Sequence, residues 1–235
     1  IGAVGMRSLT FLVARYGASA FFVAVSVIAL VGLLLVPVAL KGREARRSRD
    51  EAAGVVSSRV LTALLSVFLF FGGLALVWAF LERIATAHGF DVAGVATALS
   101  ASAISGIAGS LSVALFAHRL AIRPALLLGC ALLIMCAAGL IASSDIGFGV
   151  AICLLTFTWN FLFSFLFRIV ALTDERAGGL VPVATSAALS VGPAIGGIIL
   201  NRGGIVMLDA VFLATTLGAL ALAGSVSRRC RAGSI

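Results

Sequence analysis

Residues 60–82 read VLTALLSVFLFFGGLALVWAFLE, an apolar run whose only charged side chain is its last residue. A bilayer core about 30 Å thick needs about 20 helical residues, so this run predicts a membrane-spanning helix. Further runs of the same kind follow and precede it. We expect spans at 18–40, 60–82, 93–117, 124–143, 147–171, 179–200 and 205–226. The chain is therefore predicted to be an all-α, polytopic transmembrane helical bundle of about seven spans.

The composition excludes a water-soluble protein. Of the 235 residues, 62% are hydrophobic and 11% are charged, whereas about a quarter of the residues of a soluble domain are charged. A porin-like barrel is excluded as well, because its strands alternate over about ten residues. The formal charge of +8 comes from basic residues in loops between spans. Membrane lipid, and no nucleic acid, is therefore the expected environment.

Basic residues also predict the orientation of the bundle. The connection 41–59, KGREARRSRDEAAGVVSSR, is the one long polar loop. If it is cytoplasmic, the loops on its side carry most of the 17 Lys and Arg residues, as the positive-inside rule requires. These are Lys41, Arg43, Arg46, Arg47, Arg49, Arg59, Arg119, Arg123, Arg176, Arg228, Arg229 and Arg231. This orientation predicts a cytoplasmic C-terminus.

Two short motifs resemble those of a known family. The loop AHRLAIRP (117–124) is similar to the motif-A echo of the major facilitator superfamily, with Arg119 and Arg123 at basic positions and His118 where that motif has Asp. The stretch VGPAIGG (191–197) resembles the Gly-Pro-rich part of helix 11 in that family. The resemblance implies that Arg119 and Arg123 lie in a loop that locks one conformational state, in a bacterial cytoplasmic (inner) membrane protein.

The same resemblance implies a domain organisation. Residues 1–40 would be the end of an N-terminal bundle (the tail of helix 5, then helix 6) and 41–59 a basic cytoplasmic linker. A six-helix bundle would occupy 60–226 and a cytoplasmic tail 227–235. Because the chain begins with Ile1, we interpret it as a fragment whose partner is the missing N-terminal half of the same polypeptide.

The resemblance further implies secondary active transport of a small organic solute by alternating access. Of the possible transport modes, proton-coupled efflux, which is an antiporter activity, is the one we expect. Uptake of a metabolite is the second expectation. The alternative is a seven-helix membrane sensor or assembly subunit without transport activity.

Polar residues mark the middle of the expected span 147–171. It contains TFTWNFLFSF (156–165), in which Thr156, Asn160 and Ser164 follow one another at intervals of four and so share one helix face. Polar groups inside a membrane protein commonly face a substrate pathway. The stripe is a predicted substrate-binding face. The alternative is an interhelical hydrogen bond that stabilises the bundle by about 1 kcal/mol or less.

Two tryptophans and one carboxylate complete the predicted cavity. Trp159 lies near the middle of its span, and Trp78 lies one turn before Glu82, on a face continued by Phe71. Glu82 is predicted to bind a cation or carry a coupling proton. The alternative is an interfacial acid beside Arg83.

The remaining sequence features concern helix packing, one further carboxylate and the absence of metal-binding and catalytic motifs. Gly192, Pro193 and Gly196 predict close helix packing and a kink. Asp209, one turn into the last span, is expected to be solvated at the interface. The cysteines form no metal-ligand pattern and no phosphate-binding glycine loop occurs. We therefore expect no metal, no cofactor and no enzymatic activity.

Overall fold

The computed structural model describes residues 57–116, 119–142 and 144–232. The span expected at 18–40, the domain 1–40, nearly all of the linker 41–59 and the end of the tail lie outside these residues. The described part belongs to one compact unit, Val56–Ile235.

The prediction of an all-α membrane bundle is confirmed. Five helices are long and apolar enough to cross a membrane, namely α4, α6, α7, α8 and α9, and no strand occurs in the described ranges. The elements are α4 (Ser58–Trp78), α5 (Leu81–Ala87), α6 (Val92–Phe116), α7 (Ile122–Ile141), α8 (Asp145–Thr173), the 3-10 helix η1 (Glu175–Leu180) and α9 (Val181–Ala232).

Short polar residues fix where two of these helices begin. The Ser57 hydroxyl accepts a hydrogen bond from the Val60 amide (3.3 Å), and the Ser144 hydroxyl accepts one from the Gly147 amide (3.1 Å). Serine is among the preferred N-cap residues because its side chain satisfies an amide that has no partner within the helix. The caps place the starts of α4 and α8 within two residues of the expected spans.

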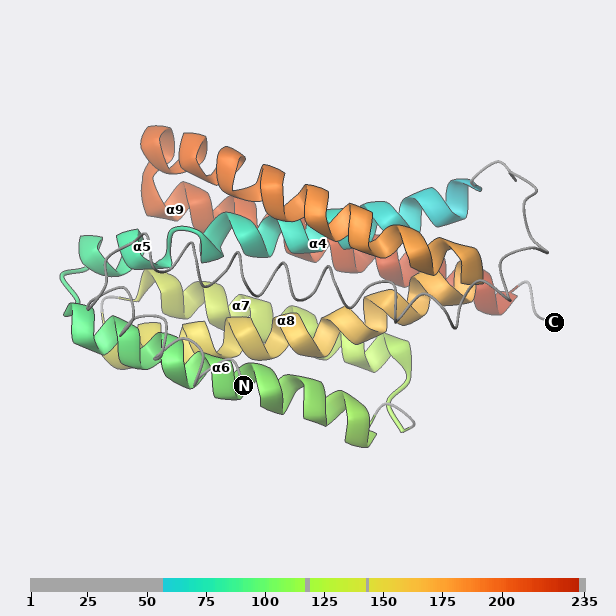
Figure 1. Ribbon diagram of the computed structural model, residues 1–235, viewed down its shortest axis with the longest axis horizontal. Coiled ribbons are helices and arrows are strands. Elements are labelled where there is room, and N and C mark those ends of the chain that lie inside the picture. Colours follow the sequence, from blue (N-terminus) through green and yellow to red (C-terminus); the bar gives the residue numbers. More distant parts are fainter. Residues whose placement is uncertain (1–56, 117–118, 143, 233–235) are drawn as a thin grey trace, which may run out of the picture. The chain divides into compact units, whose positions relative to one another are not determined.

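Helix α9 consists of two arms. Its 52 residues would extend about 78 Å as one straight helix, more than twice a bilayer core. Gly204 interrupts it with φ 70° and ψ −169°, a backbone region that only glycine adopts readily. Figure 1 shows the chain turning back there, so that the second arm runs antiparallel to the first. The two arms correspond to the spans expected at 179–200 and 205–226.

The span expected at 60–82 is not one continuous helix. Helix α4 ends at Trp78, and Phe80, with φ −119° and ψ 10°, lies outside helical geometry before α5 begins at Leu81. Trp78 and Glu82 therefore lie on different helices, and the common face expected for them is wrong. No proline or glycine marks this break.

Successive long helices run antiparallel (Figure 1), so that the connections between them, which carry most of the charged residues, lie at two ends. Helices α4 and α7 begin at the end where α6 and α9 finish. We call this end, where Arg59, Arg119, Arg123 and Arg228 lie together with Asp174 at the end of α8, the basic end. The opposite end carries Glu82, Arg83, Asp91, Asp145 and Arg202.

The core lies between α4, α8 and the two arms of α9. Phe70 on α4, Phe161 and Phe165 on α8 and Phe212 on α9 are fully buried there. Helix α4 packs mainly on α9, while α8 packs on α6 and α7. Helix α8 also contacts α4, so it lies between α4 and α6.

Candidate solute-binding face

Aromatic side chains on α8 meet aromatic side chains on α4. The Trp159 ring lies edge-on to Phe71, with centroids 5.8 Å apart, and to Trp78, with centroids 6.0 Å apart. Phe163 makes a similar contact with Phe71 at 5.4 Å. Each edge-to-face pair contributes about 0.5–1.5 kcal/mol beyond its buried area. Phe71, Trp78, Trp159 and Phe163 together form what we call the aromatic cluster.

One side of the aromatic cluster is open. Phe71 is 5% exposed and anchors the cluster, whereas Phe163 is 38% exposed. Trp78 and Trp159 are half-buried. Phe167 is 41% exposed and extends this surface, because its ring centroid lies 6.2 Å from that of Phe163. A ligand on this side would contact the exposed Phe163 ring and the two half-buried indoles.

Polar groups border the aromatic cluster on α8. Thr156, Asn160, Phe163 and Phe167 are spaced by four, three and four residues and so form one stripe along the helix. Thr156 and Asn160 are half-buried. The outward side chains of α7, by contrast, are aliphatic, including Leu127, Leu128, Ile134 and Met135. A mixed aromatic and polar stripe is typical of a pathway rather than of a lipid-facing surface.

The hydrogen bonds of Asn160 connect α8 to α6. Its Nδ2 donates to the Thr156 carbonyl at 2.9 Å, and its Oδ1 accepts from the Ser110 hydroxyl at 3.4 Å. At Gly106 an added Cβ would lie 2.9 Å from that Nδ2. Asn160 therefore packs directly on α6, although its contact with Ser110 is long for an O–H···O bond. The sequence allowed two interpretations of Asn160, as a polar group that faces the substrate or as part of an interhelical hydrogen bond. Both remain predictions.

Removing the Asn160 side chain separates these two interpretations. In a double-mutant cycle on the free energy of unfolding, we expect Asn160→Ala and Ser110→Ala to couple by about 0.6 kcal/mol or less, the usual value inside membranes. We also expect Asn160→Ala to lower transport more than Ser110→Ala does. Equal effects of the two variants on transport, together with a coupling above about 1.5 kcal/mol, would assign Asn160 to structure alone.

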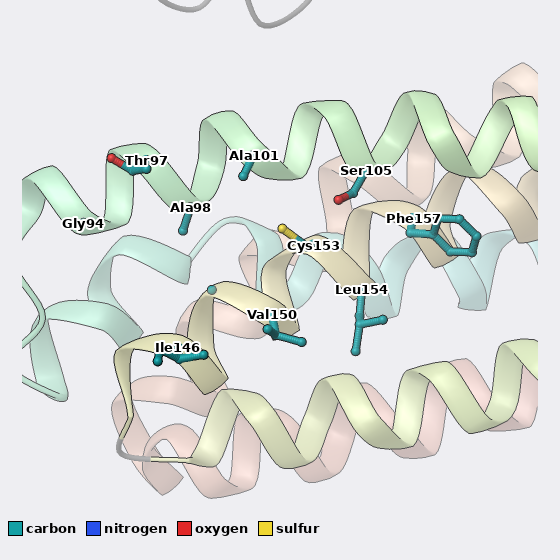
Figure 2. Close-up of a pocket in the computed structure, with 11 residues that line it drawn as sticks. Gly94, Thr97, Ala98, Ala101, Ser105, Ile146, Val150, Cys153, Leu154 and Phe157 are labelled. Carbon is teal, nitrogen blue, oxygen red and sulfur yellow. The ribbon is translucent and has the colours of Figure 1, made fainter.

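A cavity continues from this stripe toward the opposite end (Figure 2). It lies between α6 and α8 and has a volume of about 480 Å³. Ala98, Ala101 and Ser105 point from α6 toward α8, and Cys153 points from α8 toward α6. The lining is almost wholly apolar, so the cavity suits a hydrocarbon or aromatic group and not an ion.

Of the other predicted site residues, Ser164 lies beside this stripe and Glu82 lies away from it. Ser164 is half-buried, one turn beyond Asn160 on α8. Glu82 is exposed in the first turn of α5, at the opposite end. Its neighbour Arg83 donates from Nη1 to Asn201 Oδ1 at 3.1 Å. Glu82 thus lies at the opposite end of the bundle and is not part of the aromatic cluster.

The loop arginines lie at the basic end. Arg119 is exposed in the α6–α7 connection, where its amide donates to the Phe116 carbonyl at 2.9 Å. Arg123 is exposed in the first turn of α7. His118 lies outside the described residues.

Gly192 and Gly196 lie at close contacts between α9 and α4. A Cβ at Gly192 would be 2.6 Å from the Gly72 carbonyl oxygen, and one at Gly196 would be 2.8 Å from the Leu76 oxygen. Pro193, inside α9, lacks an amide hydrogen and leaves one carbonyl of the preceding turn without its helical donor.

Asp209 is not solvated, so the expectation of an interfacial carboxylate is wrong. It is 4% exposed, and within the described ranges its Oδ1 has no hydrogen-bond donor. Its chain neighbour Leu208 and, one turn on, Phe212 are fully buried. Packing of the second α9 arm covers the carboxylate, although it lies close to the end of its span.

Phe163 and Phe167 are the site residues that sequence reasoning missed, and Phe71 was predicted only as a continuation of the Trp78 face. The spacing of Trp159, Phe163 and Phe167 at intervals of four is a signal that could have identified this face. Phe71 could not be assigned to it without knowing that α4 lies beside α8.

The membrane-length apolar helices define a multi-pass integral membrane protein. A family model, described as Major Facilitator Superfamily, matches residues 1–174, well over half of the 235. The chain belongs to the Major Facilitator Superfamily, and it is a membrane transporter of that type, a class of carriers and not of enzymes. No curated protein and no solved structure matched the chain.

Proposed function

We propose that this chain takes part in secondary active transport of a small aromatic or apolar organic solute by alternating access. The observation that carries the proposal is the half-open aromatic cluster on α4 and α8, bordered by Thr156 and Asn160. Ring faces attract flat apolar groups and organic cations. The neighbouring amide and hydroxyl supply the few polar contacts that orient a ligand in a mostly apolar site.

Alternating access needs a second bundle that moves against this one. We propose that the N-terminal half of the same polypeptide supplies it, with 41–59 as the linker and 60–226 as the six-helix bundle. The close contacts of Gly192 and Gly196 with α4 support the proposal that α4 and α9 move together as one body. In the proposed orientation the basic end and the tail 227–235 are cytoplasmic in a bacterial inner membrane, and Arg119 and Arg123 lock one state.

Proton-coupled efflux is the proposed direction, with Glu82 as the coupling carboxylate. Its exposure at the opposite end gives it access to water outside the cell. A proton gained there and released inside would drive solute outward, because the proton moves down its gradient.

Transport by the intact protein in proteoliposomes tests this proposal. With an imposed pH gradient, ethidium, a planar aromatic cation, should accumulate well above the level in empty vesicles, whereas a methyl glucoside should not. Glu82→Gln should retain gradient-independent exchange and lose gradient-driven accumulation, while Asp145→Asn, an exposed acid at the same end, should retain both. Accumulation of the sugar alone would contradict the substrate class. Normal gradient-driven accumulation by Glu82→Gln would contradict the coupling assignment.

A further inference from the structure

A groove separate from the aromatic cluster opens at the basic end, between α7 and the second arm of α9. Its volume is about 390 Å³, within the usual range of about 300–1,000 Å³ for ligand sites. Leu126, Leu127 and Cys130 line it from α7, and Leu217, Leu220 and Gly224 line it from α9. Both walls belong to membrane-length helices.

Two arginines lie at the mouth of this groove. Arg123, in the first turn of α7, and Arg228, near the end of α9, both contribute to its lining. Both are exposed, and neither forms an ion pair with any residue that the structure describes. Both guanidinium groups line the same groove, and a guanidinium can donate two hydrogen bonds to the oxygens of a phosphate. The mouth is therefore electrostatically suited to a phosphate.

The depth of the groove matches one leaflet of the bilayer. From Arg123 to Cys130 the α7 wall extends about 10 Å, and from Arg228 to Leu217 the α9 wall extends about 16 Å, at about 1.5 Å per residue. Half of a hydrocarbon core is about 15 Å. An amphiphile with its anionic group at the arginines would thus place its hydrocarbon chain along Leu126 and Leu220.

We propose that this groove binds an anionic phospholipid from the leaflet that meets the basic end. The paired guanidinium groups hold the phosphate, and an acyl chain lies along the apolar walls. Gly224 leaves room for that chain, since a Cβ there would lie 3.8 Å from Leu126 Cδ1 and any longer side chain would extend into the groove. A free phosphate would satisfy the arginines but would leave the apolar walls without a ligand.

Native mass spectrometry of the intact, delipidated protein tests the proposal. The probes are phosphatidylglycerol and phosphatidylcholine with identical oleoyl chains. We expect the protein to bind phosphatidylglycerol more tightly. The Arg123→Gln/Arg228→Gln double variant should lose affinity for it by about 25-fold, at about fivefold per arginine near a lipid surface. Arg59→Gln is the matched control, because Arg59 is exposed at the same end on α4, outside the groove.

Two further measurements distinguish a lipid site from a site for free phosphate. Gly224→Leu keeps both arginines and fills the groove, so it should also weaken phosphatidylglycerol binding. Glycerol phosphate, which has no acyl chains, should not compete with the lipid. Equal binding of the two lipids, an unchanged preference in the double variant or in Gly224→Leu, or effective competition by glycerol phosphate would each overturn the proposal.

Discussion

Trp159→Ala is expected to lower the transport rate by about tenfold or more without lowering the amount of protein in the membrane. The indole contacts Phe71 and Trp78, and in the proposed site its half-buried ring also contacts the solute, so its removal eliminates ring contacts of about 0.5–1.5 kcal/mol each. A loss of about 1.4 kcal/mol corresponds to a factor of ten. Initial rates of ethidium transport, normalised to protein inserted in the proteoliposomes, provide the measurement.

Trp159→Phe is the matched variant for this prediction. It retains a ring at the same position, so we expect it to keep at least about a third of the wild-type rate. Loss of insertion in both variants would assign Trp159 to folding instead of binding. A wild-type transport rate in a normally inserted Trp159→Ala protein would show that the aromatic cluster is not part of the solute site.

Gly192→Ala is expected to destabilise the bundle by about 1–3 kcal/mol, the usual cost of inserting a carbon into a filled core. The added Cβ would lie 2.6 Å from the Gly72 oxygen and 3.0 Å from Ala75 Cβ. Because the closer atom belongs to the α4 backbone, the helices themselves have to separate. A lower midpoint of thermal unfolding in detergent is the expected observation.

Gly218→Ala is the control on the same helix. Nothing lies within 4 Å of a Cβ at Gly218, so alanine there should be neutral or should stabilise the helix by up to about 1 kcal/mol. Equal thermal midpoints for the two variants would contradict the close approach of α4 and α9.

Hydropathy predicted the described spans because a helix must satisfy its own backbone hydrogen bonds inside a membrane. The division of α9 was also visible, since Arg202, Gly203 and Gly204 interrupt the apolar run. The break between α4 and α5 was not, because Phe80 leaves helical geometry without a proline or glycine at that point. It depends on tertiary packing, which a single sequence does not encode locally.

The candidate site could be predicted only in part. Helical periodicity placed Thr156, Asn160 and Ser164 on one face, but it could not say that Gly106 of α6 lies against Asn160. For Asp209, distance from the end of the span suggested solvation. Burial depends instead on which helices surround a residue, and here they cover the carboxylate.

We propose that the α8 stripe faces an aqueous solute pathway and not lipid. Cysteine labelling of the intact protein in membranes tests it most directly, after Cys130, Cys136, Cys153 and Cys230 are replaced by serine or alanine. A water-soluble maleimide should modify Phe163→Cys, and an aromatic solute should slow that modification. Met135→Cys, on the outward surface of α7, should stay unmodified. Labelling of neither position, or equal labelling of both with no protection by solute, would show that the α8 stripe does not face a solute pathway.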